Sequence, residues 1–317
     1  MSDGQEKKYE IVKTDWIELI DDEHIKHRLF RIRAIKDFDD VKSGDYGGYI
    51  ESEDNLNQYD TSWLYSDAVR ISKNTRAWGN ARVYSNGKLY NSAEVRDNGV
   101  VCGNAKVYED ALIAGNAKVH GNSYIHGISK LYDNVNVSGD LVNIYGNTIL
   151  RDRVVIDGEV TICDTVSISS DVNITGSNIT IDGEVVIDEP TNISSDALIQ
   201  SNDDFISVNN IGSRRDVLTA WLSADKVIMV NTGCFTNTYD EFLAAVNDVH
   251  STNQFGIEYR NFAEAIKNRF MGNEPSQGGS GTTPSPDEDY SDKEIMDAID
   301  DIWDEDGYTP SDNQTTT

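Results

Sequence analysis

Cys234 and His250 are the two residues of this chain whose types could form a nucleophilic pair. Cys234 lies in the segment VNTGCFTNT, and His250 ends the helix that the following residues predict. A histidine that approaches a cysteine can take the thiol proton and make the sulfur a nucleophile. A cysteine at the end of a strand is also frequently a small buried apolar residue. Both interpretations stay open, and no other residue is a candidate for catalysis.

His120 and His126 are of a type that binds metal ions, but their spacing argues against a joint site. They are six residues apart, and no third histidine lies nearby in the sequence. A zinc site needs three or four converging ligands. Cys102, Cys163 and Cys234 are widely spaced and form no Cys-x-x-Cys pair, which argues against a cysteine-based zinc site and against a disulfide framework. The sequence therefore predicts no metal site and no cofactor.

A repeat of six residues carries most of these side chains. Aliphatic residues recur at multiples of six from position 71 to position 137, and Ala77 fills the one interrupted place. The frame shifts by one residue before Ile144 and again before Ile181, and it ends near Pro190. A small residue, alanine or serine, follows four places after many of the aliphatic ones. A period of six residues is typical of parallel β-helices.

This pattern resembles the hexapeptide repeat of left-handed β-helices, in which three hexads make one triangular coil. The resemblance covers residues 62–195 and implies about seven coils. Residues three hexads apart should then stack, because neighbouring strands lie ~4.8 Å apart. His120 and His126 should lie on adjacent faces. The predicted columns are Asn80, Asn98, Asn116 and Asn134; Asn86, Asn104 and Asn122; and Tyr90, Tyr108, His126 and Tyr145.

The segments on either side of the repeat are not repetitive. Residues 1–61 contain two runs that alternate like strands, followed by a Gly-rich turn in SGDYGGYIES, and predict a small β cap. Residues 196–270 predict an α+β domain with three short strands and two helices. The first helix opens at the capping box Thr238-x-x-Glu241 and is expected to pack through Phe242, Val246 and Val249. The second helix is expected to pack through Tyr259, Phe262, Ile266 and Phe270.

The end of the chain differs in composition from the rest. Residues 271–290 are a Gly/Ser/Pro linker, and residues 291–317 are an acidic tail with one short helical pattern. The apolar positions of that pattern, Ile295, Ile299, Ile302 and Trp303, predict docking to a partner protein or to another copy of the chain. The whole chain has a net charge of -28, which argues against binding to nucleic acid.

The membrane and secretion signals are missing from the sequence. No stretch approaches the ~20 apolar residues of a membrane helix, and the first residues lack the apolar region of a signal peptide. We therefore expect no membrane insertion and a protein that is made in the host cytoplasm and not secreted. Beyond residue 151 the outward positions of the repeat become rich in Val and Thr. Such faces are suited to burial in a homotrimer, although soluble strands remain an alternative.

The run LFRIRAIKDFDDVKSGDYGGYIESEDNL, followed by Asn-Ala-x-Val-Tyr hexads, resembles a family of hexapeptide-repeat proteins frequent in bacteriophages and prophages. The segment GCFTNTYDEFLAAV resembles the α+β domain that closes many of those proteins, and YSDKEIMDAIDDIW resembles acidic C-terminal segments of phage structural proteins. The chain departs from the family where Val/Ile/Thr hexads replace the Asn-Ala-x-Val-Tyr type.

This resemblance implies a non-enzymatic phage structural protein, such as a virion fibre, a head decoration or another accessory protein. It would contact another virion protein through residues 291–304, and a host surface or host protein is a further possible partner. One alternative is a hexapeptide-repeat acyl or sugar transferase, although the basic column Arg70, Lys88 and Lys106 is short for binding a pyrophosphate. Another alternative is an intracellular phage effector that binds a host protein or a small molecule.

Overall fold

The computed structural model describes residues 6–20, 24–65, 70–71 and 74–271. The predicted linker after residue 271 and the predicted docking residues Ile295, Ile299, Ile302 and Trp303 lie outside the described residues. The fold is mainly β: a parallel β-solenoid of about seven turns, a small N-terminal antiparallel sheet, and a C-terminal sheet with two helices. In the described part of the chain, no helix is both long and apolar enough to cross a membrane.

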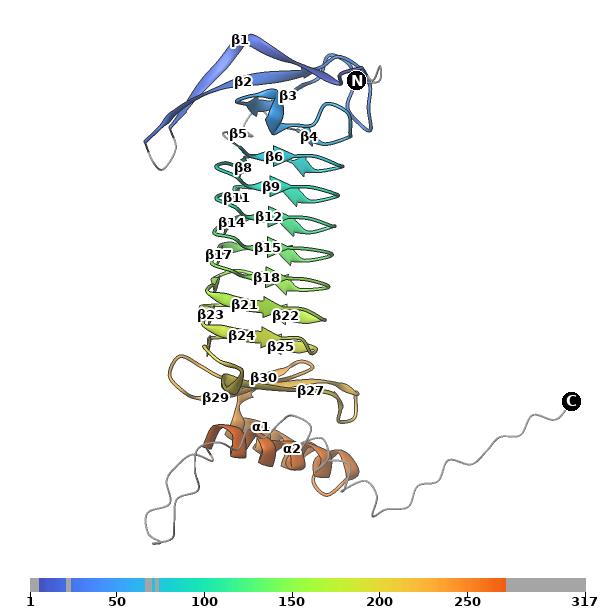
Figure 1. The fold of residues 1–317 in the computed structure, drawn as a ribbon. Helices are drawn as coiled ribbons and strands as arrows, with labels where there is room; N and C mark the ends of the chain where they lie inside the picture. The colour runs from blue at the N-terminus through green and yellow to red at the C-terminus, as the bar shows by residue number, and fades with distance from the viewer. Residues whose placement is uncertain (1–5, 21–23, 66–69, 72–73, 272–317) are drawn as a thin grey trace, which may run out of the picture. The chain divides into compact units, whose positions relative to one another are not determined.

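The solenoid is built from three parallel sheets, each contributing one short strand to every turn (Figure 1). Among the described residues, the first sheet also takes in the N-terminal strands. Its strands are β1 (Tyr9–Ile20), β2 (Lys26–Ala34), β3 (Tyr46–Ile50), β5 (Arg70–Ile71), β8 (Lys88–Leu89), β11 (Lys106–Val107), β14 (Asn122–Ile125), β17 (Asp140–Ile144), β20 (Val160–Ile162), β23 (Ile179–Ile181) and β26 (Ala197–Ile199).

The other two sheets contain solenoid strands alone. The second comprises β4 (Trp63–Leu64), β7 (Arg82–Val83), β10 (Val100–Val101), β13 (Lys118–Val119), β16 (Asn136–Val137), β19 (Val155–Ile156), β22 (Val172–Ile174) and β25 (Thr191–Ile193). The third comprises β6 (Arg76–Ala77), β9 (Glu94–Val95), β12 (Leu112–Ile113), β15 (Lys130–Leu131), β18 (Ile149–Leu150), β21 (Thr165–Ile168) and β24 (Glu184–Ile187).

The register between successive turns follows the predicted coil of three hexads. Val101 pairs with Val119, and Val119 pairs with Val137. Where the sequence frame shifts, the offset grows by one residue: Ile125 pairs with Ile144, and Ile162 pairs with Ile181. The extra residue of the first shift produces an irregularity between Asn122 and Tyr124. Each shift is therefore absorbed between strands, and the aliphatic side chains stay on the inner face.

The interior of the solenoid is a continuous apolar core. The described aliphatic positions of the repeat are fully buried or nearly so, from Ala77 to Ile199. The small residues four places later, including Ala105, Ala111, Ala117 and Ser123, are buried as well. In the earlier turns an aliphatic and a small residue of each hexad therefore fill the interior together, whereas in the later turns residues such as Val160, Val166 and Val172 are buried at the second position.

The N-terminal sheet is continuous with the solenoid. β1 and β2 are antiparallel, β2 pairs antiparallel with β3, and β3 pairs parallel with β5 of the next turn. The predicted Gly-rich turn is present before β3: the Asp45 backbone N–H donates to the Lys42 carbonyl oxygen at 2.9 Å, and Gly44 has a φ of 99°. The prediction did not include β3 itself, which contains the next two glycines. Gly47 is needed there because a Cβ atom would lie 2.7 Å from the Ile32 side chain and 2.8 Å from the Leu64 carbonyl oxygen. The glycine permits close packing of the sheet.

The C-terminal module is an antiparallel sheet of β27 (Phe205–Ile211), β28 (Asp216–Leu222), β29 (Ile228–Thr232) and β30 (Phe235–Thr238), covered by α1 (Tyr239–Val249) and α2 (Gln254–Met271). The buried ring of Trp221 joins the core of the solenoid, and its Nε1 donates to the Asp196 carbonyl oxygen at 3.0 Å. The module therefore shields the apolar end of the solenoid from solvent.

The two helices follow the predicted capping and packing in most respects. The Thr238 side chain accepts a hydrogen bond from the Glu241 backbone N–H at 3.4 Å, as expected of an N-cap. Phe242 and Val246 are buried. The predicted contact of Val249 is wrong, because its side chain is 69% exposed. Val249 is the last residue of α1, where the helix passes the edge of its own core.

Candidate functional site

The C-terminal module contains a cavity of about 250 Å³ that brings Cys234 and His250 to one place. Its lining is partly apolar and partly polar. The apolar lining residues are Phe235, Phe242, Ala245, Val246, Val249 and Tyr259, and the others are Ser213, Arg214, Asp216, Thr232, Gly233, Cys234 and His250. A pocket with apolar walls and a few polar groups is suited to binding a small molecule.

The thiol of Cys234 is exposed and lies beside a cation. The Arg214 Nη1 atom donates a weak hydrogen bond to the Cys234 Sγ atom at 3.6 Å. Gly233, the residue before it, has a φ of 58°, a backbone conformation that β-turn glycines adopt readily. This turn between β29 and β30 places the thiol at the cavity.

His250 is held by neighbours other than Cys234. Its ring centroid lies 5.5 Å from that of Tyr259 and 6.1 Å from that of Phe255. Its Nδ1 atom lies 3.5 Å from the Asn253 Nδ2 atom. Among the described residues no hydrogen bond joins His250 to Cys234, so the geometry places a guanidinium, and not an imidazole, against the thiol.

The first predicted Asn column forms a continuous ladder, whereas the second is bonded from Asn86 to Asn104 but, among the described residues, not onward to Asn122. Asn80 donates to Asn98 at 2.8 Å, Asn98 to Asn116 at 2.9 Å, and Asn116 to Asn134 at 3.1 Å, each from Nδ2 to Oδ1. In the second column Asn86 donates to Asn104 at 3.0 Å. These hydrogen bonds between side-chain amides run along the solenoid from turn to turn. They connect the turns and place no acid, base or nucleophile together.

The aromatic column is a stack of half-buried rings. Tyr90, Tyr108, His126 and Tyr145 follow one another with ring centroids 5.1, 4.5 and 4.9 Å apart. His126 is therefore held between two tyrosines, and its Nε2 lies 3.0 Å from the Asn143 Oδ1 atom. His120 follows β13 in a different sheet. The two histidines do not converge, as their spacing predicted.

In the short basic column, the position after Lys106 is occupied by an aromatic residue. Arg70, Lys88, Lys106 and Tyr124 occupy equivalent places on successive strands. The Lys106 Nζ atom lies 4.9 Å from the centroid of the Tyr124 ring. Lys106 is thus in contact with a neighbouring side chain of its own solenoid.

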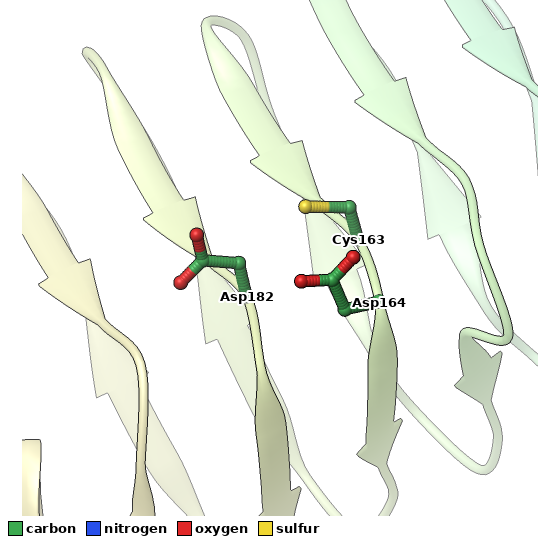
Figure 2. A group of neighbouring side chains, drawn as sticks. All are labelled: Cys163, Asp164 and Asp182. Atoms are coloured by element: carbon green, nitrogen blue, oxygen red, sulfur yellow. The ribbon is translucent and has the colours of Figure 1, made fainter.

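Sequence reasoning missed a cluster of one cysteine and two aspartates, which lies where the column of aromatic rings is followed by residues without rings. The register places Cys163 after Tyr145, Asp182 after Cys163, and Gln200 after Asp182 in the same column. Figure 2 shows the Cys163 and Asp164 side chains beside the Asp182 side chain of the next turn. One ligand atom from each of these three residues lies within 4.8 Å of the other two. The signal in the sequence was the second frame shift, which aligns Asp182 with Cys163.

The environment of Cys163 disfavours ionisation of its thiol. Burial is the largest cause that raises the thiol pKa, and the charges of Asp164 and Asp182 raise it further, while a hydrogen bond with Tyr145 acts in the opposite direction. The side chain is 6% exposed. The thiol, unlike that of Cys234, is enclosed between two turns of the solenoid.

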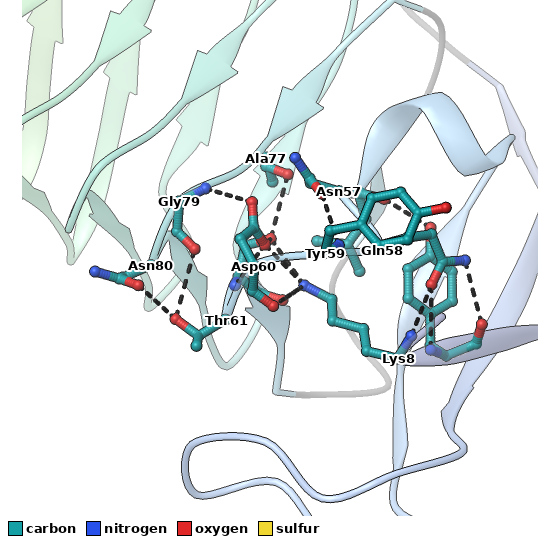
Figure 3. A network of polar contacts seen from close by, with 12 residues as sticks. Lys8, Asn57, Gln58, Tyr59, Asp60, Thr61, Ala77, Gly79 and Asn80 are labelled. Carbon is teal, nitrogen blue, oxygen red and sulfur yellow. Dashed lines mark hydrogen bonds and ion pairs between the residues drawn. The ribbon is translucent and has the colours of Figure 1, made fainter. Parts of the chain in front are cut away.

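A third polar cluster fastens the N-terminal strand to the first turns of the solenoid (Figure 3). The Lys8 ammonium donates to Asp60 Oδ1 at 2.9 Å, to the Asp60 carbonyl oxygen at 3.0 Å and to the Ser62 carbonyl oxygen at 2.7 Å. Asp60 also accepts from the Gly79 backbone N–H at 2.6 Å. Burial lowers the pKa of Lys8 to about 8, against the opposing effect of Asp60. Beside it, burial raises the pKa of Tyr9 well above its ordinary value.

Comparison with known proteins does not assign this chain to a family: no protein-family model matches it, and no curated protein matches it. The fold that the structure defines is that of a β-solenoid with an N-terminal antiparallel sheet and a C-terminal sheet with helices.

Proposed function

We propose that this chain is a structural protein of a bacteriophage particle, in which the solenoid is a rigid, non-enzymatic spacer that presents the C-terminal module. The observation that carries this proposal is the unbroken pairing of successive turns in three parallel sheets. Backbone hydrogen bonds join every described turn to the next, as from Arg82 N–H to the Gly99 carbonyl oxygen and from Lys118 N–H to the Val135 carbonyl oxygen. About seven turns at ~4.8 Å give a rod on the order of 35 Å.

Two further features suit a part that must keep its shape. The Asn ladders and the stacked rings join the same turns outside the core, so the coils are connected by side chains as well as by backbone. Closed ladders also make unfolding slow, because many turns must separate before water reaches the core. The phage context rests on the sequence resemblance, and it is part of the proposal.

Exposed β-branched residues on two faces of the solenoid support assembly into a homotrimer. Val155 on β19 and Val186 on β24, strands of two different sheets in the later turns, are 38% and 47% exposed. Burying such a face between copies is favourable, because each Å² of apolar surface removed from water contributes roughly 25 cal/mol. In the particle, the acidic tail would hold the protein to another virion component through Ile295, Ile299, Ile302 and Trp303.

Mass spectrometry of purified particles of the phage that encodes this chain tests the proposal. We expect the chain to be present, with cross-links from residues 291–304 to one virion protein. The variant Ile299→Asp should abolish incorporation, whereas the matched variant Asp300→Asn should be incorporated normally. If the wild-type chain is missing from purified particles, the structural role is wrong.

A ligand-binding role is the second candidate, and the cavity beside Cys234 and Arg214 favours it. An intracellular effector could hold a small molecule with an apolar body and an anionic group there, the anion facing the Arg214 guanidinium. A transferase would need an acyl or sugar donor in a comparable place. Titration with acetyl coenzyme A and with sugar nucleotides, followed by thermal shift, tests this role. An increase in melting temperature that Arg214→Ala removes would support it, and no increase with any ligand would contradict it.

A further inference from the structure

The cluster of Cys163, Asp164 and Asp182 lies where the aromatic column of the solenoid ends. On the N-terminal side, successive turns are joined by stacked rings as far as Tyr145. On the C-terminal side, the same column continues with a thiol, a carboxylate and an amide, which cannot stack. Cys163 and Asp164 follow β20, and Asp182 follows β23, the strand that pairs with β20 in the next turn. The Cys163 and Asp164 side chains of one turn therefore lie beside the Asp182 side chain of the next turn (Figure 2).

One oxygen of this cluster is buried without a hydrogen-bond partner. The Asp182 Oδ1 atom is shielded from solvent and accepts no hydrogen bond among the described residues. Its other oxygen, Oδ2, accepts a long bond from Gln200 Nε2 at 3.5 Å. Leaving a buried carboxylate oxygen unsatisfied is costly, so such a group in a native protein points to a partner such as an ion. A second carboxylate, that of Asp164, lies beside it and adds like charge.

From this geometry we propose that Cys163, Asp164 and Asp182 bind a borderline transition-metal cation, Zn²⁺, between two turns of the solenoid. A thiolate with two carboxylates is a mixed sulfur and oxygen donor set. Sulfur excludes Mg²⁺ and Ca²⁺ as preferred occupants, since both prefer oxygen ligands alone. Binding replaces the Cys163 S–H bond by a sulfur–metal bond and releases the proton to solvent.

The arrangement fits the size of such an ion. Zinc bonds of about 2.0–2.3 Å to oxygen and sulfur in a tetrahedral site place donor atoms about 3.3–3.8 Å apart. The ligand atoms here lie within 4.8 Å of one another, so small side-chain rotations bring them into range. Asp164 is exposed, and its Oδ2 atom accepts a long bond from the Gly183 backbone N–H at 3.3 Å, which a bound ion can replace. Its exposure also leaves a fourth position open to water. The ion would join the turns at the point where ring stacking stops.

Cobalt(II) is the probe for this site, because a Cys–Co²⁺ bond gives a charge-transfer absorption in the near ultraviolet that carboxylates alone do not give. The full chain is titrated with Co²⁺ in a large excess of Mg²⁺, which occupies sites made only of carboxylates. We expect one Co²⁺ per chain with this absorption, and displacement of Co²⁺ by Zn²⁺. Absence of the absorption in the wild-type chain would overturn the proposal.

Three variants locate the site. Cys163→Ser should abolish the absorption, and the matched variant Cys102→Ser should keep it. Asp182→Asn, which preserves shape, should weaken Co²⁺ binding at least about tenfold, and Asp164→Asn provides a second test at an exposed position where folding is not at risk. Absorption that persists in Cys163→Ser, or an affinity that neither Asp variant changes, would overturn the site. The outcome is independent of whether the chain occurs in virions.

Discussion

Replacing Lys8 by methionine should weaken the attachment of the N-terminal strand to the solenoid, although Lys8 lies near the start of the chain. The Lys8 side chain is 1% exposed, and its ammonium donates to Asp60 and to Ser62. Methionine keeps the length and the apolar contacts but removes the charge. Asp60 then loses its buried cation, although it keeps bonds from the backbone N–H groups of Ser62 and Gly79.

The size of the effect follows from the burial of the pair. Removing one partner of a buried ion pair costs about 3–5 kcal/mol. The lowered pKa of Lys8 shows that burial disfavours its charge, and Asp60 is 19% exposed and keeps other donors. We therefore expect a smaller loss, about 1 kcal/mol, for Lys8→Met at pH 7. The double variant Lys8→Met/Asp60→Asn should lose less than the sum of the two single variants, because it leaves no unpaired charge.

The pH dependence gives a second signature of the same group. The folded-state pKa of Lys8 is about 8, below the ordinary value of 10.5. Between these two values the unfolded chain binds the proton more strongly, so stability rises with pH through this window. The gap between the two pKa values corresponds to about 3 kcal/mol. Wild-type stability should therefore rise by up to this amount relative to Lys8→Met between pH 8 and pH 10.5.

Amide hydrogen exchange with mass spectrometry measures both effects, because it reports the opening of β1, β2 and β3 separately from the rest of the solenoid. The matched control is Lys7→Met, whose lysine is exposed and paired with exposed Glu53, and this variant should leave exchange unchanged. The reasoning is refuted if Lys8→Met exchanges at the wild-type rate at pH 7. It is also refuted if the stabilities of Lys8→Met and the wild type depend on pH in the same way.

Three further changes test the ladders and the closed end of the solenoid. In the Asn column, Asn98→Ala removes two side-chain hydrogen bonds and should cost about 2 kcal/mol, whereas Asn134→Ala removes one and should cost about 1 kcal/mol. Urea unfolding measures both losses, and equal losses would contradict a ladder whose bonds contribute additively. In the ring stack, His126→Ala should cost about 1–2 kcal/mol and His126→Phe much less, measured in the same way; an equal loss in both would mean that stacking is not the source. At the C-terminal end, Trp221→Ala should destabilise by about 3–5 kcal/mol and speed hydrogen exchange in β25 and β26, and unchanged exchange there would show that Trp221 does not protect this end.

Much of the solenoid could be predicted because its pattern is local and repeated. The six-residue spacing predicts which aliphatic residues are buried. Both frame shifts keep these residues on the inner face, so the positions of the strands and columns can be counted from the sequence. The Asn and Tyr columns needed only the additional assumption of three hexads per turn. Because the same six-residue pattern occurs many times in one chain, it is improbable that the spacing arises by chance.

The remaining features depend on contacts between distant segments. Gly47 reads as a turn residue, yet its role is to let β3 approach Ile32 and Leu64. Lys8 reads as a surface charge, and only the approach of Asp60 gives it a buried partner. The cavity shared by Cys234 and His250 depends on how α1 and α2 cover the sheet. Such placements are set by tertiary packing, which the spacing of residues along the chain does not encode.

Pairing at an offset of three hexads has a consequence for how the length of this protein can change in evolution. Duplication or deletion of one full coil would leave each remaining strand opposite an equivalent strand, and each Asn or ring opposite its counterpart. A change of one or two hexads would keep the aliphatic residues inside but would move later strands to a different sheet and break the Asn and ring columns. A change that is not a multiple of six would turn inner aliphatic residues outward unless, like the two single-residue shifts, it were absorbed at a corner. The distance between the ends of the rod can therefore be adjusted in steps of ~4.8 Å, while the N-terminal and C-terminal closures are inherited unchanged.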